Sequence, residues 1–322
     1  MTTSASNDEL RLLVKVSRFY YEDGLNQDAI KARLGLSRSK VSRLMAQARE
    51  AGIVQISVVT PEQLFLDLES RLEEQFGLQE ALVVEVQLGD TQESVNRVVG
   101  SAAAGYLVRA VESHSTIGLC WGSTLRHMAA ALTPQRFPDA QLVQIIGGLG
   151  HPEAEVHATE LCRSVSRSLG CRLTLLPVPG IVADQRTRQA LLSDVHVQRA
   201  VEACGHLDLA FVGVGAPTPD SVTMRDGSII TQAELDGLLE KGAVGDIALR
   251  YFDAQGRGVE SEINDRIIGI TLEQLKRGPK VVAVSGGPQK VPAISAALRG
   301  GLIDVLVTDS LTAEKLVETS HG

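Results

Sequence analysis

Most of this chain's fold class is decided by residues 116–124, Thr116-Ile117-Gly118-Leu119-Cys120-Trp121-Gly122-Ser123-Thr124. The first five residues are mainly small or apolar and suit a buried strand, and Gly122 permits the close turn that follows. Ser123 and Thr124 then place hydroxyl groups at the opening of a helix. A strand joined by a short turn to a helix is the repeating unit of α/β folds.

Six further runs of strand length lie on either side of this stretch: Ala81–Val86, Gln141–Ile146, Arg172–Leu176, Leu207–Val214, Lys280–Ser285 and Asp304–Thr308. Helical patterns separate them, for example at Thr91–Arg109, His157–Leu169 and Pro292–Arg299. Near-continuous apolar strands that alternate with helices predict a largely parallel, doubly wound sheet with helices on both faces.

Ligands of such sheets bind beyond the carboxyl ends of the strands, where this chain carries several glycine-rich loops. Besides Gly122-Ser123-Thr124 they contain Gly147-Gly148, Val178-Pro179-Gly180, Gly213-Val214-Gly215 and Ser285-Gly286-Gly287-Pro288-Gln289-Lys290. A helix start with Ser123 and Thr124 can hold a phosphate through its free amide groups, and Lys290 can add a positive charge.

The N-terminal part of the chain has a different pattern. An apolar repeat over residues 8–22 predicts a first helix, and Asn26 precedes a second at residues 27–34 that Gly35 ends. Ser37 then caps a third helix at residues 38–49, in which Val41, Leu44, Met45 and Ala48 form one apolar stripe. Helix, glycine turn and polar helix within about 25 residues is helix-turn-helix spacing.

The outer face of the third helix carries cationic and hydroxyl side chains, as a recognition helix requires for base edges and phosphates. The candidate DNA-binding residues are Gln27, Ser37, Arg38, Ser39, Lys40, Ser42 and Arg43. An ordinary helical bundle with a basic face is the alternative. Alternation at Val54, Ile56 and Val58 further suggests the short strand of a winged variant.

These patterns predict a DNA-binding domain at residues 1–59 and a ligand-binding domain at residues 60–322. The second domain begins with an amphipathic helix over residues 62–76, which we expect to pack on its own domain rather than to pair with another subunit. Charge divides in the same way. Residues 1–60 hold nine Lys or Arg against six Asp or Glu, whereas the remainder holds 22 against 33.

Composition excludes several classes of protein. No apolar run approaches the length of a membrane-spanning helix, and the N-terminus lacks a signal-peptide pattern, so we expect a cytoplasmic protein. The four cysteines form no Cys-x-x-Cys pair. His151 and His157 do not have a standard metal-ligand spacing. We therefore expect no metal, no cofactor and no catalytic residues.

The ordered motifs resemble the SorC family of bacterial regulators, which includes sugar-catabolic and glycolytic repressors. The resemblance covers residues 10–318 and rests on residues 34–44, 118–124, 213–217, 245–253 and 285–290. It implies a body similar to phosphosugar isomerases and deaminases that serves as a sensor. Cys120 stands where the family often has serine, and Ile146 where some relatives have a polar or basic residue.

The resemblance also implies partners and effector-binding residues. The partners are double-stranded operator DNA, a small effector that is expected to be a sugar phosphate, and further copies of the chain in a homodimer or homotetramer. The expected effector-binding residues are Gly122, Ser123, Thr124, Gly147, Gly148, Gly215, Asp246, Arg250 and Lys290.

Two other functions remain open at this point. One is an active phosphosugar isomerase or deaminase with a DNA-binding head, for which Asp246, Asp265 and His151 supply candidate acid–base groups. The other is a sensor of a neutral sugar or polyol, which would leave Ser123, Thr124 and Lys290 without an anion to bind. The sequence does not identify the effector, the operator or the direction of regulation.

Overall fold

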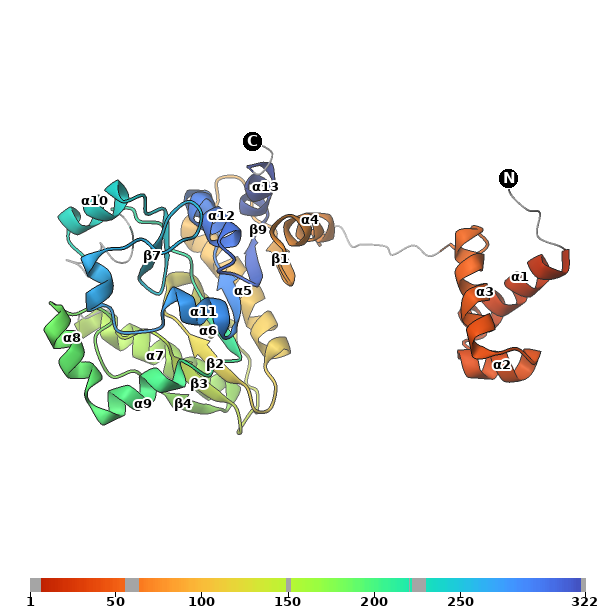
Figure 1. Ribbon diagram of the computed structural model, residues 1–322, viewed down its shortest axis with the longest axis horizontal. Helices are drawn as coiled ribbons and strands as arrows, with labels where there is room; N and C mark the ends of the chain where they lie inside the picture. The colour runs from red at the N-terminus through yellow and green to blue at the C-terminus, as the bar shows by residue number, and fades with distance from the viewer. Residues whose placement is uncertain (1–6, 56–63, 149–151, 220, 222–229, 320–322) are drawn as a thin grey trace. The chain divides into compact units, whose positions relative to one another are not determined.

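The computed structural model describes residues 7–55, 64–148, 152–219, 221 and 230–319. The chain forms two compact units, Met1–Pro61 and Glu62–Gly322, each with its own hydrophobic core (Figure 1).

The N-terminal unit consists of three helices, α1 (Asn7–Tyr21), α2 (Gln27–Leu34) and α3 (Arg38–Glu50). Asn26 Oδ1 accepts a hydrogen bond from Ala29 N at 2.9 Å, and Gly35 ends α2 in the left-handed conformation. Ser37 Oγ in turn accepts from Lys40 N at 3.2 Å and caps α3. The capping residues expected from the sequence therefore set both helix starts and the turn between them.

The apolar stripe of α3 is buried, as its spacing predicts. Val41, Leu44, Met45 and Ala48 pack with Ile30 of α2 and with residues of α1 in one cluster. The winged strand is not formed where the structure describes it, because Val54 and Gln55 lie in a bend and in coil. Ile56 and Val58 lie outside the described residues.

A seven-stranded parallel sheet forms the centre of the second unit, in the order β1-β9-β8-β5-β2-β3-β4. Its strands are β1 (Glu80–Val84), β2 (Thr116–Leu119), β3 (Gln141–Gln144), β4 (Arg172–Thr174), β5 (Leu209–Val212), β8 (Lys280–Val284) and β9 (Val305–Asp309). All seven strand-like runs of the sequence are in this sheet. The prediction of a largely parallel α/β body is confirmed.

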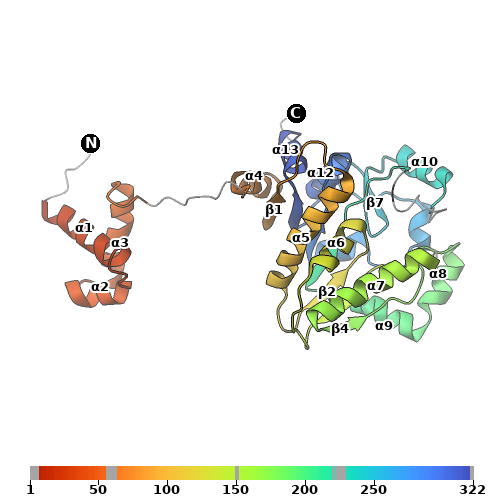
Figure 2. The ribbon, with the colours of Figure 1, turned by 180° about the vertical axis from the view of Figure 1, so that it is seen from behind.

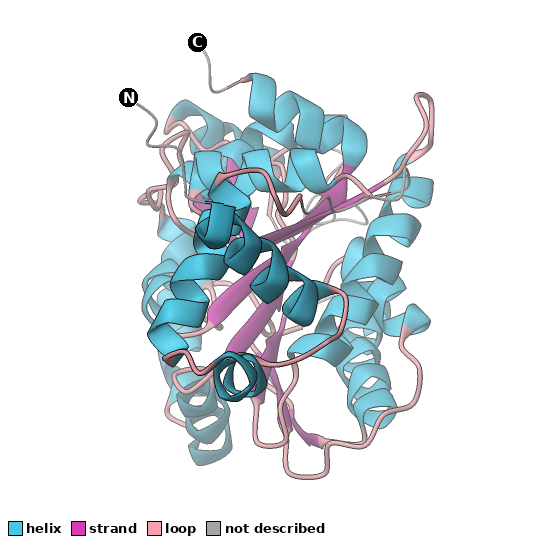
Figure 3. Ribbon diagram, turned by 90° about the vertical axis from the view of Figure 1, so that its right-hand side faces the viewer, coloured by secondary structure: helices cyan, strands magenta, loops and turns pink. Residues whose placement is uncertain are grey.

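Helices cover both faces of the sheet, as Figure 3 shows. The helices that follow β1 are α5 (Gln92–Ala110), α6 (Ser123–Ala131), α7 (Pro152–Leu169), α8 (Gln185–Leu192), α9 (Val195–Ala203), α10 (Gln232–Glu240), α11 (Leu272–Arg277), α12 (Val291–Arg299) and α13 (Ser310–Glu318). In Figure 2 the helices α5, α6 and α7 lie in front of the sheet, whereas α11 and α12 lie on the opposite face. Among the described residues, none of the helices combines the length and apolar character that crossing a bilayer requires.

A two-stranded antiparallel hairpin, β6 (Gly245–Ile247) and β7 (Arg250–Phe252), was not predicted from the sequence. Its two-residue turn places Ala248 and Leu249 at φ angles of 52° and 65°. Such turns usually contain Asn or Gly, because left-handed backbone is costly for other residues. The hairpin therefore lacks the sequence signal that would have revealed it.

Helix α4 (Leu66–Phe76) packs on the second unit, as expected. It borders the edge strand β1, where Glu73 Oε1 accepts from Ala81 N at 2.9 Å and Glu69 Oε1 accepts from Val83 N at 2.8 Å. Gln75 Nε2 also donates to Leu316 O of α13 at 3.3 Å. These bonds hold α4, the first helix after residues 56–63, against the second unit.

Candidate functional site

The sheet order creates a crevice between β2 and β5. From β2 the chain proceeds through β3 to β4 at one edge, and then returns to β5 on the other side of β2. The loops that follow β2 and β5 therefore diverge, and α/β sheets usually bind their ligands at such a point, beyond the carboxyl ends of the strands. A cavity of about 530 Å³ lies there. It is lined by Gln92, Glu93, Asn96, residues 120–126, residues 213–216, Thr218, Ser221, Asp246, Ala248, Leu249, Gln289 and Lys290.

One wall of the cavity is the N-terminus of α6. Ser123 and Thr124 occupy its first turn, and Gly122 before them provides no side chain to cap the helix. The first amide groups of a helix have no partner within the helix and carry its positive dipole end. This wall can therefore hold an anionic group such as phosphate.

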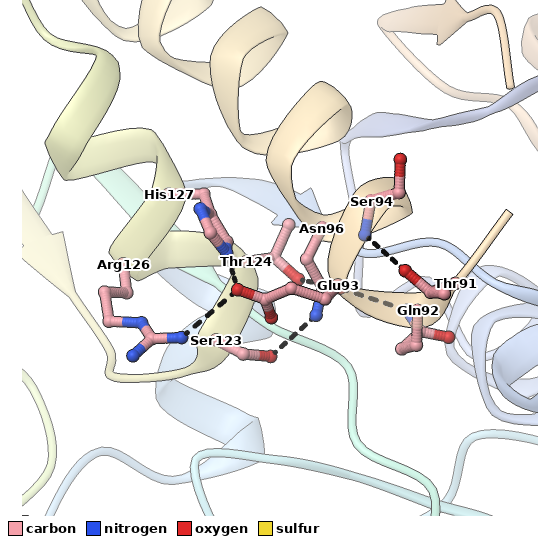
Figure 4. A network of polar contacts seen from close by, with 9 residues as sticks. All are labelled: Thr91, Gln92, Glu93, Ser94, Asn96, Ser123, Thr124, Arg126 and His127. Carbon is pink, nitrogen blue, oxygen red and sulfur yellow. Dashed lines mark hydrogen bonds and ion pairs between the residues drawn. The ribbon is translucent and has the colours of Figure 1, made fainter.

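A buried asparagine fixes the two hydroxyl groups of this wall (Figure 4). Asn96 of α5 donates from Nδ2 to Ser123 Oγ at 3.2 Å and accepts from Thr124 Oγ1 at 3.0 Å. Its Oδ1 also accepts from Gln92 Nε2 at 3.0 Å. Asn96 is only 4% exposed, so its side chain is held by the surrounding protein. Its hydrogen bonds therefore fix the two hydroxyl groups independently of any ligand.

Asp246 and Lys290 also line the cavity and interact through their charges. Asp246 belongs to the β6–β7 hairpin, which is joined to the loop after β5 by two backbone bonds between Gly215 and Asp246, at 2.9 and 3.0 Å. Burial raises the pKa of Asp246 to about 6, against the bond from Leu249 N and the charge of Lys290. Burial also lowers the pKa of Lys290, which the charge of Asp246 opposes.

The loop that leads to Lys290 is held between two elements. Gln92 Nε2 donates to Gly286 O at 3.0 Å, so the same amide joins this loop to Asn96 and the α6 wall. On the other side, Gly287 N donates to Asp309 Oδ2 and Thr312 Oγ1, both at 2.8 Å. Any side chain on Gly286 would clash, since its Cβ would lie 2.2 Å from Asp309 Oδ2.

Six of the expected effector-binding residues line the cavity: Gly122, Ser123, Thr124, Gly215, Asp246 and Lys290. Gly147 and Gly148 are not among its lining residues. They bond to other loops instead: Gly147 N donates to Ile268 O at 3.1 Å, and Gly148 N to Val178 O at 2.9 Å. A Cβ on Gly147 would lie 2.5 Å from Val178 O, so glycine is needed there for packing.

Arg250 is also placed differently from the sequence-based expectation. It is 8% exposed and does not line the cavity. Its Nε donates to Ile270 O at 3.1 Å, Nη1 to Asn264 O at 3.2 Å and Nη2 to Ile267 O at 3.5 Å. The guanidinium thus holds the segment that precedes α11, and burial lowers its pKa to about 10. Arg250 has a structural role.

Sequence reasoning missed the contribution of α5, which brings Gln92, Glu93 and Asn96 to the cavity. It also missed Arg126 of α6. The available signal was the position of α5, since its first turn follows the carboxyl end of β1 and can therefore reach the same edge of the sheet.

The N-terminal unit presents a second candidate surface. Arg38, Ser39, Lys40, Ser42 and Arg43 are exposed on the face of α3 that lies opposite its buried stripe. The side chain of Gln27 is less available, because it is half-buried with Nε2 3.9 Å from Met45 Sδ. Ser37 Oγ already bonds Lys40 N as the cap of α3 and lies 3.1 Å from Ser39 Oγ.

Comparison with known proteins identifies the family. Residues 61–318 match the model of the family described as "Putative sugar-binding domain". The chain is 32% identical over 310 residues to the deoxyribonucleoside regulator of Bacillus subtilis. This alignment covers 96% of this chain and 98% of the relative. It is 31% identical over 320 residues to the sorbitol operon regulator of Klebsiella pneumoniae. That alignment covers 97% of this chain and 99% of the relative.

A solved structure extends the likeness over both units. The full-length sorbitol operon regulator SorC from Klebsiella pneumoniae superposes with a TM-score of 0.73 at 28% identity. The match covers 98% of this chain and 100% of that chain. A regulator described as of the DeoR family, from Listeria monocytogenes, has a TM-score of 0.72 at 34% identity over 78% of this chain and 98% of its own length. This chain therefore belongs to the SorC family of transcriptional regulators that carry the sugar-binding domain.

Proposed function

We propose that the chain is a DNA-binding transcriptional regulator of carbohydrate metabolism whose operator affinity is controlled by a sugar phosphate bound in the β2–β5 cavity. One observation carries the proposal: the uncapped N-terminus of α6, with Ser123 and Thr124, shares a cavity with the cationic side chain of Lys290. This arrangement suits a ligand with an anionic group at one end and hydroxyl groups elsewhere. The names of the relatives support regulation of sugar-related operons.

The effector assignment is tested by paired ligands. A thermal-shift screen of the full chain against sugar phosphates and the matching free sugars should give stabilisation by at least one phosphorylated compound and not by its unphosphorylated form. Thr124→Val should remove that stabilisation, because it takes away the hydroxyl that bonds Asn96. Stabilisation by a neutral polyol alone would favour the sensor of non-phosphorylated sugars.

DNA binding is assigned to the exposed face of α3. Arg38, Lys40 and Arg43 supply charge for phosphates and base edges, and Ser39 and Ser42 supply hydroxyl donors on the same face. The triple substitution of Arg38, Lys40 and Arg43 by alanine should abolish sequence-specific binding to an operator selected from random duplexes. A matched control replaces Arg11, Lys15 and Arg18, which are exposed cations of α1. Specific binding that survives in the α3 variant would reject this surface.

We further propose that the protein binds its operator as a homodimer or homotetramer and has no catalytic activity. One observation favours the enzymatic alternative, since Asp246 and Lys290 both have shifted pKa values in the cavity, as catalytic groups often do. Asp265, however, is exposed outside the cavity lining, and His151 lies outside the described residues. Steady turnover of any aldose or ketose phosphate by the purified chain would establish the enzyme instead.

A further inference from the structure

Two cations and two carboxylates line the described part of the cavity, and they are arranged as two pairs. Lys290 and Asp246 lie on the wall formed by the hairpin and the lysine loop, where each charge offsets the effect of burial on the other. Arg126 and Glu93 lie at the α6 wall, with Arg126 Nη2 3.7 Å from Glu93 Oε1. Each cation of the cavity lining therefore interacts with the charge of a carboxylate.

The second pair stands beside the proposed phosphate position. Arg126 follows Ser123 and Thr124 in the first turn of α6, and Glu93 lies in the first turn of α5 (Figure 4). A phosphate at the α6 N-terminus would consequently approach the negative charge of Glu93. Like charges at close range disfavour binding unless a cation lies between them.

The contact between Arg126 and Glu93 is easily broken. It joins single atoms at 3.7 Å between side chains that are 64% and 54% exposed. Exposed pairs of this kind contribute little to stability. A phosphate offers the guanidinium two parallel charge-assisted bonds, which are stronger. Glu93 would keep a partner after the exchange, since His127 Nε2 lies 3.0 Å from the same Glu93 Oε1.

We propose that Arg126 is a phosphate-binding residue that determines specificity, and that Glu93 holds it at the cavity until an anionic effector takes Glu93's place. The inference rests on the proposed function, because it assumes that the α6 wall receives the effector's phosphate. It adds the reason why a neutral sugar would bind poorly: such a ligand cannot displace Glu93 from Arg126. His127 retains the displaced carboxylate beside the wall.

The test measures the Kd of the full chain for inorganic phosphate and for D-ribose 5-phosphate, at constant ionic strength. Arg126→Gln should raise both values by about tenfold or more, as expected for loss of charge-assisted bonds, and Arg126→Lys should give a smaller increase. Glu93→Gln should lower both values several-fold. Arg97→Gln and Glu112→Gln remove the same charges at exposed positions that do not line the cavity, and should leave both values within about twofold.

The double variant Glu93→Gln/Arg126→Gln separates two explanations of the effect of Glu93: occupation of Arg126, or repulsion of the phosphate. If Glu93 acts by occupying Arg126, the gain from Glu93→Gln should shrink in the Arg126→Gln background. An equal gain in both backgrounds would overturn the occupation of Arg126 by Glu93. If the wild type binds phosphate and Arg126→Gln binds it with the same affinity, the role of Arg126 is overturned while the proposed phosphate site stands. If the wild type binds neither probe, both the proposed phosphate site and the role of Arg126 are overturned.

Discussion

Gly215 lies so close to Asp246 that a Cβ atom on residue 215 would be 2.1 Å from Asp246 Oδ1. The two residues also exchange backbone hydrogen bonds, which fix the hairpin against the loop after β5. The carboxylate cannot turn away freely, because its Oδ2 accepts from Leu249 N at 3.2 Å. The glycine after β5 is therefore what allows an acidic residue to enter the β2–β5 cavity.

Gly215→Ala should displace the Asp246 carboxylate and weaken effector binding by at least about tenfold, with a loss of about 1–3 kcal/mol in stability from the overpacked contact. Titration calorimetry with the effector found by thermal shift would measure the first effect, and urea unfolding the second. Gly105→Ala is the matched control, since a Cβ there meets nothing within 4 Å and Gly105 does not line the cavity. Equal behaviour of the two variants would show that the close approach has no importance for binding.

Asp246 should make stability depend on pH in an unusual direction. Its pKa is raised from 3.8 to about 6 by burial, so the folded chain holds this proton more strongly than the unfolded chain does. The stabilisation is complete below about pH 4 and is lost as the pH rises through about 6. The Tm of Asp246→Asn should therefore rise relative to that of the wild type between pH 4 and pH 7.

Thermal unfolding of both proteins across this pH range is the measurement. Asp265→Asn serves as the control, because Asp265 is exposed and does not line the cavity. Parallel pH profiles for the wild type and Asp246→Asn would contradict a carboxyl group that binds its proton more strongly in the folded chain.

The turn of the β6–β7 hairpin should tolerate glycine but not a branched side chain. Ala248 has a φ of 52° and lines the cavity, and a β-branched residue is an outlier in this conformation. Ala248→Gly should change the free energy of unfolding by less than about 1 kcal/mol, because relief of strain offsets the added freedom of the unfolded chain. Ala248→Val should cost about 1–3 kcal/mol. Chemical denaturation of both variants tests the pair, and equal stabilities would argue against a strained turn.

Thr312 should link effector binding to the remainder of the molecule. Its hydroxyl accepts from Gly287 N at 2.8 Å and donates to Asp309 Oδ2 at 2.7 Å, at the start of α13. Near the end of α13, Leu316 O accepts from Gln75 of α4, the helix that follows residues 56–63. Thr312→Val should leave operator affinity in the absence of effector near the wild-type value and reduce the change that the effector causes.

The measured quantity is the ratio of operator Kd values with and without effector. Thr319→Val removes a hydroxyl group beyond the other end of α13, where it bonds Lys315 O and Leu316 O, and should leave the ratio unchanged. A full effector response in Thr312→Val would exclude this residue from the coupling.

The sequence was sufficient for the sheet because its strands are continuous apolar runs, buried on both faces and separated by helices. It was also sufficient for the first three helices, where Asn26, Gly35 and Ser37 each act through local backbone chemistry. The hairpin was missed because Ala248 and Leu249 do not resemble a turn, and tertiary contacts impose their conformation.

The cavity could be predicted in part, because ligand-binding loops follow the carboxyl ends of parallel strands. Ser123 and Lys290 follow strand ends and are found by that rule, whereas Arg250 has a polar side chain that the fold uses to bond three backbone carbonyls. Sequence position does not distinguish these two uses of a cation. The network of Gln92, Asn96 and Gly286 joins segments nearly 200 residues apart and becomes visible only in the folded chain.

The most direct test of the account is a fluorescence-anisotropy titration of the full chain onto a selected operator duplex, with and without the sugar phosphate that stabilises it most. The account predicts that the sugar phosphate changes operator Kd by about tenfold or more, within the usual range of allosteric coupling, whereas the unphosphorylated sugar does not. Thr124→Val should lose this response while keeping its operator affinity. An operator Kd that stays the same when the sugar phosphate is demonstrably bound would contradict the account.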